Sequence, residues 1–123
     1  RIIPIDKDHR PDAWKPWLGD SVAHWDGDVL VVETRNLHPQ QAPRNVAALS
    51  DEGVVVERFS RFSDEQVLYE FEVRDPNFYT EAWSGEMAFN ATDTQPYEYA
   101  CHEGNYGLPG ILAGARRLEM DEP

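Results

Sequence analysis

Residues 67–74 read Val-Leu-Tyr-Glu-Phe-Glu-Val-Arg, with Val67, Tyr69, Phe71 and Val73 at every second position. Successive side chains of a β-strand point to opposite faces, so this period of two predicts a strand with one apolar face. The opposite face of the same strand would present the charged side chains of Glu70, Glu72 and Arg74.

Further strands are expected on both sides of this segment. The β-branched run that follows Asp26-Gly27-Asp28 predicts a hairpin, because an Asp-Gly pair suits the tight turn between two strands. A second hairpin would join 54–62 to 67–74. The full set of expected strands is 21–25, 29–35, 54–62, 67–74, 79–91 and a final strand at 97–101.

Five or six strands in sequential order predict a mainly β fold, an antiparallel meander that closes into a small lipocalin-like barrel or forms a curled sheet. A short C-terminal helix is expected within 111–120. A parallel α/β fold is excluded, because no long helix separates successive strands. Residues 1–20 carry three prolines and predict an irregular N-terminal arm, and residues 21–123 are interpreted as a single antiparallel β-barrel domain.

The register of the second hairpin decides which charges face the core. The turn between its strands lacks glycine, which favours an even-numbered loop that pairs Phe62 with Val67 and turns Arg58 inward. A slip of one residue would instead turn Glu57 and Arg61 inward. Either register places a charged side chain among apolar ones, where it needs a partner.

The charge of the chain excludes some classes of partner. Its 123 residues include 11 basic and 23 acidic side chains, a formal net charge of −12. A nucleic-acid binder would need a basic surface, so nucleic acid is not expected as a partner. The longest apolar run, 29–32, is far too short to cross a bilayer, and no membrane insertion is expected. The one cysteine, Cys101, excludes a disulfide framework within the chain.

Residues 98–107 hold the densest group of chemically active side chains. His102 could act as a general acid or base with Glu103 or Glu98 close by, because imidazole titrates near neutral pH. The alternative is a strand end where His102 satisfies turn backbone and Cys101 is a small buried apolar side chain. The four histidines are scattered without ligand spacing, so no metal is expected. The sequence has no glycine-rich phosphate loop and no Rossmann fingerprint, so no organic cofactor is expected.

A second candidate is a ligand cavity with an inward charge, either Arg58 or Glu57 with Arg61. Such a charge would orient an anionic or polar ligand in a mostly apolar pocket. A structural role is favoured over this one: an ion pair within the fold, or an arginine that buries only its stem and extends to the rim. The expected ligand-binding residues are Arg58, Glu57, Tyr69, Phe71, Trp83, Tyr99 and Tyr106.

Four segments resemble a family of uncharacterised bacterial proteins. They are the R-I-I-P entry at 1–4, the W-x-G-x-S-x-x-x-W-x-G-D-x-L-V-V-E-T pattern at 17–34, V-E-R-F at 56–59 and E-Y-x-C-H-E-G-N-Y at 98–106. Members of that family often look longer and exported, with this region at the C-terminus. The resemblance implies a domain-sized version of such a protein and a periplasmic or exported location. It implies no particular activity.

Three functions follow as hypotheses. The first is a β-barrel that binds a small molecule in a partly polar cavity. The second is a cofactor-independent lyase, isomerase or hydrolase in which His102 and Glu103 are catalytic and Arg58 is an electrostatic clamp. The third is a structural or protein-interaction domain. The sequence leaves the oligomeric state open, with a homo-oligomer among the alternatives.

Overall fold

The structure, a computed structural model, describes residues 2–40, 47–95, 97 and 106–121. The chain divides into two compact units, 1–91 and 92–123, which we describe separately. The described secondary structure comprises strands β1 (Asp20–Asp26), β2 (Val29–Arg35), β3 (Val54–Ser63), β4 (Gln66–Arg74) and β5 (Trp83–Asn90), and helix α1 (Gly107–Asp121).

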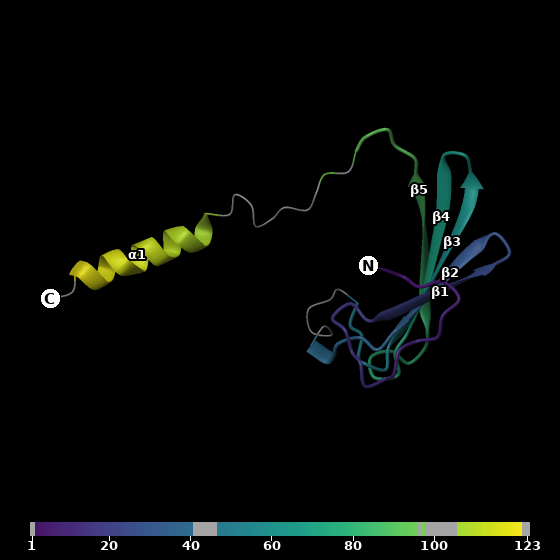
Figure 1. Ribbon diagram of the computed structural model, residues 1–123, viewed down its shortest axis with the longest axis horizontal. Helices are drawn as coiled ribbons and strands as arrows, with labels where there is room; N and C mark the ends of the chain where they lie inside the picture. The colour runs from purple at the N-terminus through teal and green to yellow at the C-terminus, as the bar shows by residue number, and fades with distance from the viewer. Residues whose placement is uncertain (1, 41–46, 96, 98–105, 122–123) are drawn as a thin grey trace. The chain divides into compact units, whose positions relative to one another are not determined.

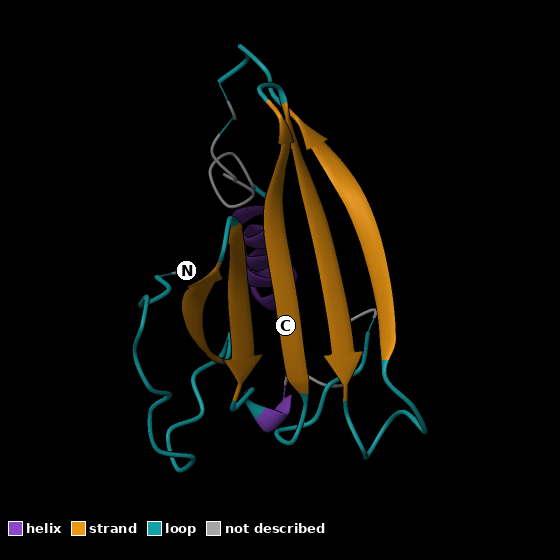
Figure 2. Ribbon diagram, turned by 90° about the vertical axis from the view of Figure 1, so that its right-hand side faces the viewer, coloured by secondary structure: helices purple, strands orange, loops and turns teal. Residues whose placement is uncertain are grey.

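The five strands form one antiparallel sheet in the order β1-β2-β3-β4-β5, in which each strand pairs with its neighbours along the chain (Figures 1 and 2). The mainly β meander expected from the sequence is confirmed. The strand pairing is linear and the sheet does not close, so the lipocalin-like barrel, one of the two expected forms, is not formed.

The first hairpin forms where the Asp-Gly pair predicts it. Asp26 pairs with Val29, which leaves Gly27 and Asp28 as a two-residue turn. Gly27 adopts a φ of 59°, a left-handed conformation that glycine enters without steric cost. The composition of this turn therefore fixes both the position of the hairpin and the register of β1 against β2.

The second hairpin also has a two-residue turn, Asp64-Glu65, but its register differs from the favoured prediction. Ser63 pairs with Gln66, whereas Arg61 pairs with Val67, so a β-bulge inserts Phe62 as an extra residue. The bulge shifts the register by one, and the predicted inward orientation of Arg58 is wrong. The alternative register, with Glu57 and Arg61 on the face of Tyr69, is the one observed.

β5 is shorter than expected, since it begins at Trp83 instead of residue 79. The preceding residues belong to a turn in which the amides of Phe78 and Tyr79 both donate to the carbonyl of Asp75. The final strand expected at 97–101 falls almost entirely outside the described residues, so that prediction stays untested.

The core of the first unit lies where β2 ends and β3 begins. Leu37, Leu49 and Val73 are buried there, and Val55, Phe71 and Tyr79 pack against them. The buried carboxyl of Asp75 ties the surrounding loops together, because it accepts hydrogen bonds from the amide and hydroxyl of Ser50 and from the amide of Asn77. These hydrogen bonds join the loops to the buried end of the sheet.

The second unit contains α1, which starts four residues earlier than the helix expected at 111–120. Its apolar side chains are exposed, including Ile111 at 70% and Leu118 at 70%. Among the described helices, none combines the length and the apolar character that a membrane crossing requires.

Candidate functional site

One face of the sheet is mostly apolar, and we call it the aromatic face. The strand registers place its side chains in straight rows across all five strands. These rows are Trp25–Leu30–Phe59–Tyr69–Met87, Ala23–Val32–Glu57–Phe71–Gly85 and Ser21–Thr34–Val55–Val73–Trp83.

Tyr69 is the centre of a continuous set of ring contacts on this face. Its ring lies 4.9 Å from that of Phe59, 5.8 Å from that of Phe71 and 5.4 Å from that of Phe89, measured between centroids. Trp83 extends the set, because its ring meets Phe71 edge-on at 5.6 Å. These separations are those of favourable offset and edge-to-face pairs, so the rings hold one another in fixed orientations.

A carboxyl group lies within this apolar surface. Glu57 is only 8% exposed, and its Oε1 accepts a hydrogen bond of 3.0 Å from the hydroxyl of Tyr69. A buried carboxyl is costly unless it is hydrogen-bonded, so the Tyr69 hydroxyl stabilises Glu57 at this position. The aromatic face therefore contains one hydrogen-bonded carboxyl group, that of Glu57, among its apolar side chains.

Much of the outer part of the aromatic face is open to solvent. Trp25 is 57% exposed, Met87 48% and Phe89 47%. Folding normally buries large apolar side chains, and exposed apolar patches of appreciable size mark sites of interaction. The exposed part thus differs from the core end of the same face, where Val32 and Val73 are buried.

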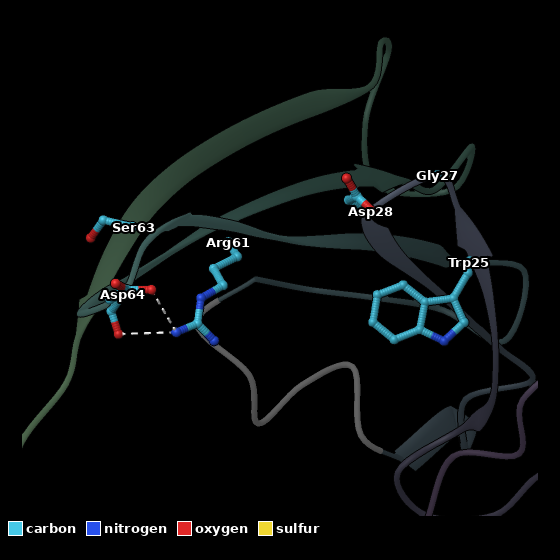
Figure 3. A pocket seen from close by; sticks show the side chains of 6 residues that line it. All are labelled: Trp25, Gly27, Asp28, Arg61, Ser63 and Asp64. Atoms are coloured by element: carbon cyan, nitrogen blue, oxygen red, sulfur yellow. Dashed lines mark hydrogen bonds and ion pairs between the residues drawn. The ribbon is translucent and has the colours of Figure 1, made fainter.

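The aromatic face is hollowed near the tips of the two hairpins. A hollow of about 960 Å³, open to solvent, is lined by residues of both hairpins. Figure 3 shows the indole of Trp25 and the guanidinium of Arg61 reaching into it from different strands. Arg61 donates to the backbone carbonyl of Asp64 at 3.2 Å and lies 3.4 Å from the carboxylate of the same residue. A smaller hollow of about 280 Å³ continues along the face, lined by Trp25, Asp28, Leu30, Phe59, Ser60, Arg61 and Val67.

The opposite face of the sheet is mixed: Val31 and Val56 are buried on it, and a charged row crosses β3, β4 and β5. Arg58 lies there, in one cross-strand row with Glu70 and Glu86, and these residues line a shallow hollow of about 440 Å³ together with Glu72. The structure thus separates Arg58 from the ring cluster. Of the residues predicted to bind a ligand, it brings together Glu57, Tyr69, Phe71 and Trp83 on the aromatic face.

The remaining predicted site residues belong either to positions outside the described residues or to the second unit. His102, Glu103 and Tyr99 lie outside the described residues, so their catalytic and ligand-binding roles stay predictions. Tyr106 belongs to the second unit, is 80% exposed and uses its carbonyl to accept a hydrogen bond from Gly110.

A polar cluster that the sequence analysis missed joins the N-terminal arm to the sheet. Nδ1 of His9 lies 2.9 Å from Oδ2 of Asp20, and Nε2 lies 3.2 Å from Oε1 of Glu33. The amide of Arg10 also donates to Asp20, at 2.8 Å. His9 precedes its partners by 11 and 24 residues, and no periodic pattern connects positions so spaced.

Both carboxyl groups of this cluster have perturbed acidity. Burial alone would raise the pKa of Asp20, but the hydrogen bonds from Arg10 and His9 outweigh it and hold the pKa below its usual range. The pKa of Glu33 is lowered chiefly by the hydrogen bond from Arg35, against an opposing effect of burial. Within the described residues, no group of three or more His, Cys, Asp and Glu side chains is arranged to hold a metal ion.

Comparison of the chain with protein-family models, with curated proteins and with solved structures finds no match. The resemblance to uncharacterised bacterial proteins therefore stays a prediction, as do the bacterial origin and the location that it implies.

Proposed function

We propose that the aromatic face binds a small organic molecule. The observation that carries the proposal is the exposed apolar surface around Trp25, Met87 and Phe89, which continues inward to a hydrogen-bonded carboxyl at Glu57. Small-molecule sites are concave, mostly apolar and furnished with a few fixed polar groups. The hollow at the hairpin tips supplies the concavity.

The preferred ligand is flat and aromatic or conjugated. The ring of Tyr69 already contacts those of Phe59 and Phe89, at 4.9 and 5.4 Å between centroids, so a further planar ring would continue the same arrangement. Because these rings are held by mutual contact, a ligand would order few side chains when it binds, which lowers the entropic cost of association.

The polar end of the ligand is a hydrogen-bond donor or a positive charge. The carboxyl of Glu57 and the negative faces of the surrounding rings both favour a cation over an anion. The net charge of −12 acts in the same direction, since it raises the local concentration of cations and repels anions. The guanidinium of Arg61, an opposite charge at the hollow, is paired with Asp64.

The first test is a fluorescence titration with the neutral probe N-phenyl-1-naphthylamine. The wild-type chain is expected to give a saturable rise in probe emission. Phe89→Ser removes an exposed ring that stacks on Tyr69, and we expect it to weaken binding about tenfold, which corresponds to about 1.4 kcal/mol.

The matched control is Ala88→Ser, a neighbouring exposed position of β5 on the opposite face. It introduces the same side chain and is expected to leave probe binding unchanged. A probe signal that fails to saturate, or an equal loss in the two variants, would contradict binding at the aromatic face.

The second test addresses ligand charge by displacing the probe with a naphthyl amine, a naphthol and a naphthoic acid. The amine should compete best and the acid worst. Glu57→Gln should remove this order of preference while it leaves naphthol binding nearly unchanged. If the acid competes as well as the amine in the wild-type chain, Glu57 does not select the ligand.

A further inference from the structure

The two edges of the sheet differ in how their backbone groups are covered. At the β1 edge the N-terminal arm forms a parallel bridge between Ile5 and Ala23. The amide of Ala23 donates to the carbonyl of Pro4 at 2.9 Å, and the amide of Asp6 donates to the carbonyl of Ala23 at 2.8 Å. At the other edge, no segment among the described residues pairs with the outer side of β5 (Figure 2).

β5 also lacks the features that usually prevent an edge strand from pairing with another chain. Natural edge strands carry proline, lysine or a bulge, or are very short. β5 has eight residues with no proline and no basic side chain, and its one charge is Glu86. Its register against β4 is unbroken from Trp83 to Asn90, so the strand presents a regular edge.

One hydrogen bond shows which amide and carbonyl groups of β5 point away from β4. The amide of Ala91 donates to the carbonyl of Glu65 at 2.7 Å, so residue 91 points toward β4. Hydrogen-bonding groups of an antiparallel strand alternate in direction from one residue to the next. The residues whose amide and carbonyl groups point away from β4 are therefore Ser84, Glu86, Ala88 and Asn90.

We propose that β5 pairs antiparallel with β5 of a second copy of this chain, with Met87 opposite Met87 on a two-fold axis. In this register Ser84 faces Asn90 and Glu86 faces Ala88, so each directly opposed hydrogen-bonding pair joins two outward-pointing residues. Two other registers, each shifted by one position in each copy, also join outward-pointing residues. One sets Glu86 opposite Glu86, which like-charge repulsion disfavours. The other sets Ala88 opposite Ala88 and pairs only residues 86–90 of each strand, which is a shorter overlap.

We assign a second copy of this chain to the open edge of β5 because the strand is complementary to itself. Opposed residues of an antiparallel pair share a face, so the aromatic faces of both copies would lie on the same side of a continuous sheet. The proposed register also sets the exposed ring of Phe89 opposite Gly85 of the other copy, beside the Phe71 ring that covers that glycine. An isologous contact of this kind closes at two copies and leaves no further edge of β5 to extend. The inference does not depend on the proposed function.

The first experiment measures the mass of the 123-residue chain by light scattering over a wide range of protein concentrations. The charge of −12 on each copy opposes association, so the measurement is made at high ionic strength. We expect a mass that rises with concentration to twice the 14.1 kDa of one chain. A mass of one chain at every concentration would overturn the proposal.

The decisive variant is Ala88→Pro, which deletes an amide that points away from β4 and so spares the pairing within the sheet. It should abolish the dimer, whereas Ala88→Ser, which keeps the amide, should retain it. Circular dichroism verifies that Ala88→Pro keeps its strand content. A folded Ala88→Pro chain that still forms the dimer would overturn the proposal.

A crosslinking experiment fixes the register even if the proline variant fails to fold. In a Cys101→Ser background, Met87→Cys places two thiols opposite each other, where Cα atoms about 4.5 Å apart permit a disulfide. Phe89→Cys is the matched control, since it shares the strand, the face and a similar exposure, 47% against 48%. Its two copies would lie about 13 Å apart along the strands. We expect an oxidised dimer with Met87→Cys only, and equal crosslinking, or none in either, would overturn the register.

Discussion

The ring of Phe71 occupies the space that a side chain on Gly85 would fill. The two residues are directly opposed on β4 and β5, and a Cβ at Gly85 would lie 2.7 Å from Cζ of Phe71. The ring is held there by its edge-on contact with Trp83 and its stacking on Tyr69. The glycine therefore permits the ring cluster of the aromatic face to extend across β5.

Gly85→Ala is expected to destabilise the chain by about 1–3 kcal/mol, the usual cost of forcing an extra carbon into a packed site. The added methyl must displace the Phe71 ring from contacts on both of its sides. Urea unfolding monitored by tryptophan fluorescence measures the change. Ser84→Ala, a neighbouring exposed position of β5, is the control and should change the free energy of unfolding by less than about 0.5 kcal/mol. Equal stabilities of the two variants would show that the Phe71 ring can move away from residue 85 without a loss in the free energy of unfolding.

The strands and their order could be predicted because the signals are local. Alternation over 67–74 and the Asp-Gly turn each act within a few residues, and the structure confirms the strands that they indicated. The register of β3 could not be predicted, since the bulge at Phe62 involves no glycine and follows no sequence rule. That single extra residue moved Arg58 off the face of Tyr69 and put Glu57 on it.

Some of the residues of the candidate site could be predicted from the sequence. Tyr69, Phe71 and Trp83 were expected to share a ligand site, and they do share one face. The row from Trp25 to Met87 can be predicted only when the registers of all four strand pairs are known. One wrong register, that of β3 against β4, was enough to prevent its prediction. The contacts of His9 depend on how an irregular arm folds back, which no period of the sequence records.

Tyr69→Phe should destabilise the chain by about 1–3 kcal/mol, because it deletes the hydroxyl that donates to the buried carboxyl of Glu57. The ring contacts of Tyr69 are preserved by phenylalanine, so the loss reports on the hydrogen bond. A double-mutant cycle with Glu57→Gln, measured by urea unfolding, isolates the coupling between the two side chains. Strict additivity of the two changes would mean that the hydroxyl and the carboxyl do not stabilise each other.

Acidification should unfold the chain partly through Asp20. The pKa of its carboxyl is lower in the folded chain than its ordinary value of 3.8, so the ionised form favours folding. This stabilisation is fully present above pH 3.8 and is lost as the pH falls through the lower, folded pKa. Urea unfolding at a series of pH values should therefore show a weaker acid dependence in Asp20→Asn than in the wild-type chain.

Asp26→Asn is the control for this experiment, because Asp26 lies on the same strand and is exposed. It should leave the acid dependence close to that of the wild-type chain. If both variants flatten the pH profile equally, the contacts of Asp20 with His9 and Arg10 are not the source of the acid sensitivity.

His9→Ala should loosen the N-terminal arm from the β1 edge. His9 connects the arm to Asp20 on β1 and to Glu33 on β2, next to the backbone pairing of Pro4 and Asp6 with Ala23. Without the imidazole, the amides of Asp6 and Ala23 should exchange with solvent about tenfold faster, measured by hydrogen exchange, because local opening sets their protection. His24→Ala, an exposed histidine on the same strand, should leave both rates unchanged. Released from the arm, β1 would become a second open edge, so His9→Ala should also associate beyond the dimer expected through β5. Unchanged exchange of both amides would show that the backbone pairing alone holds the arm in place.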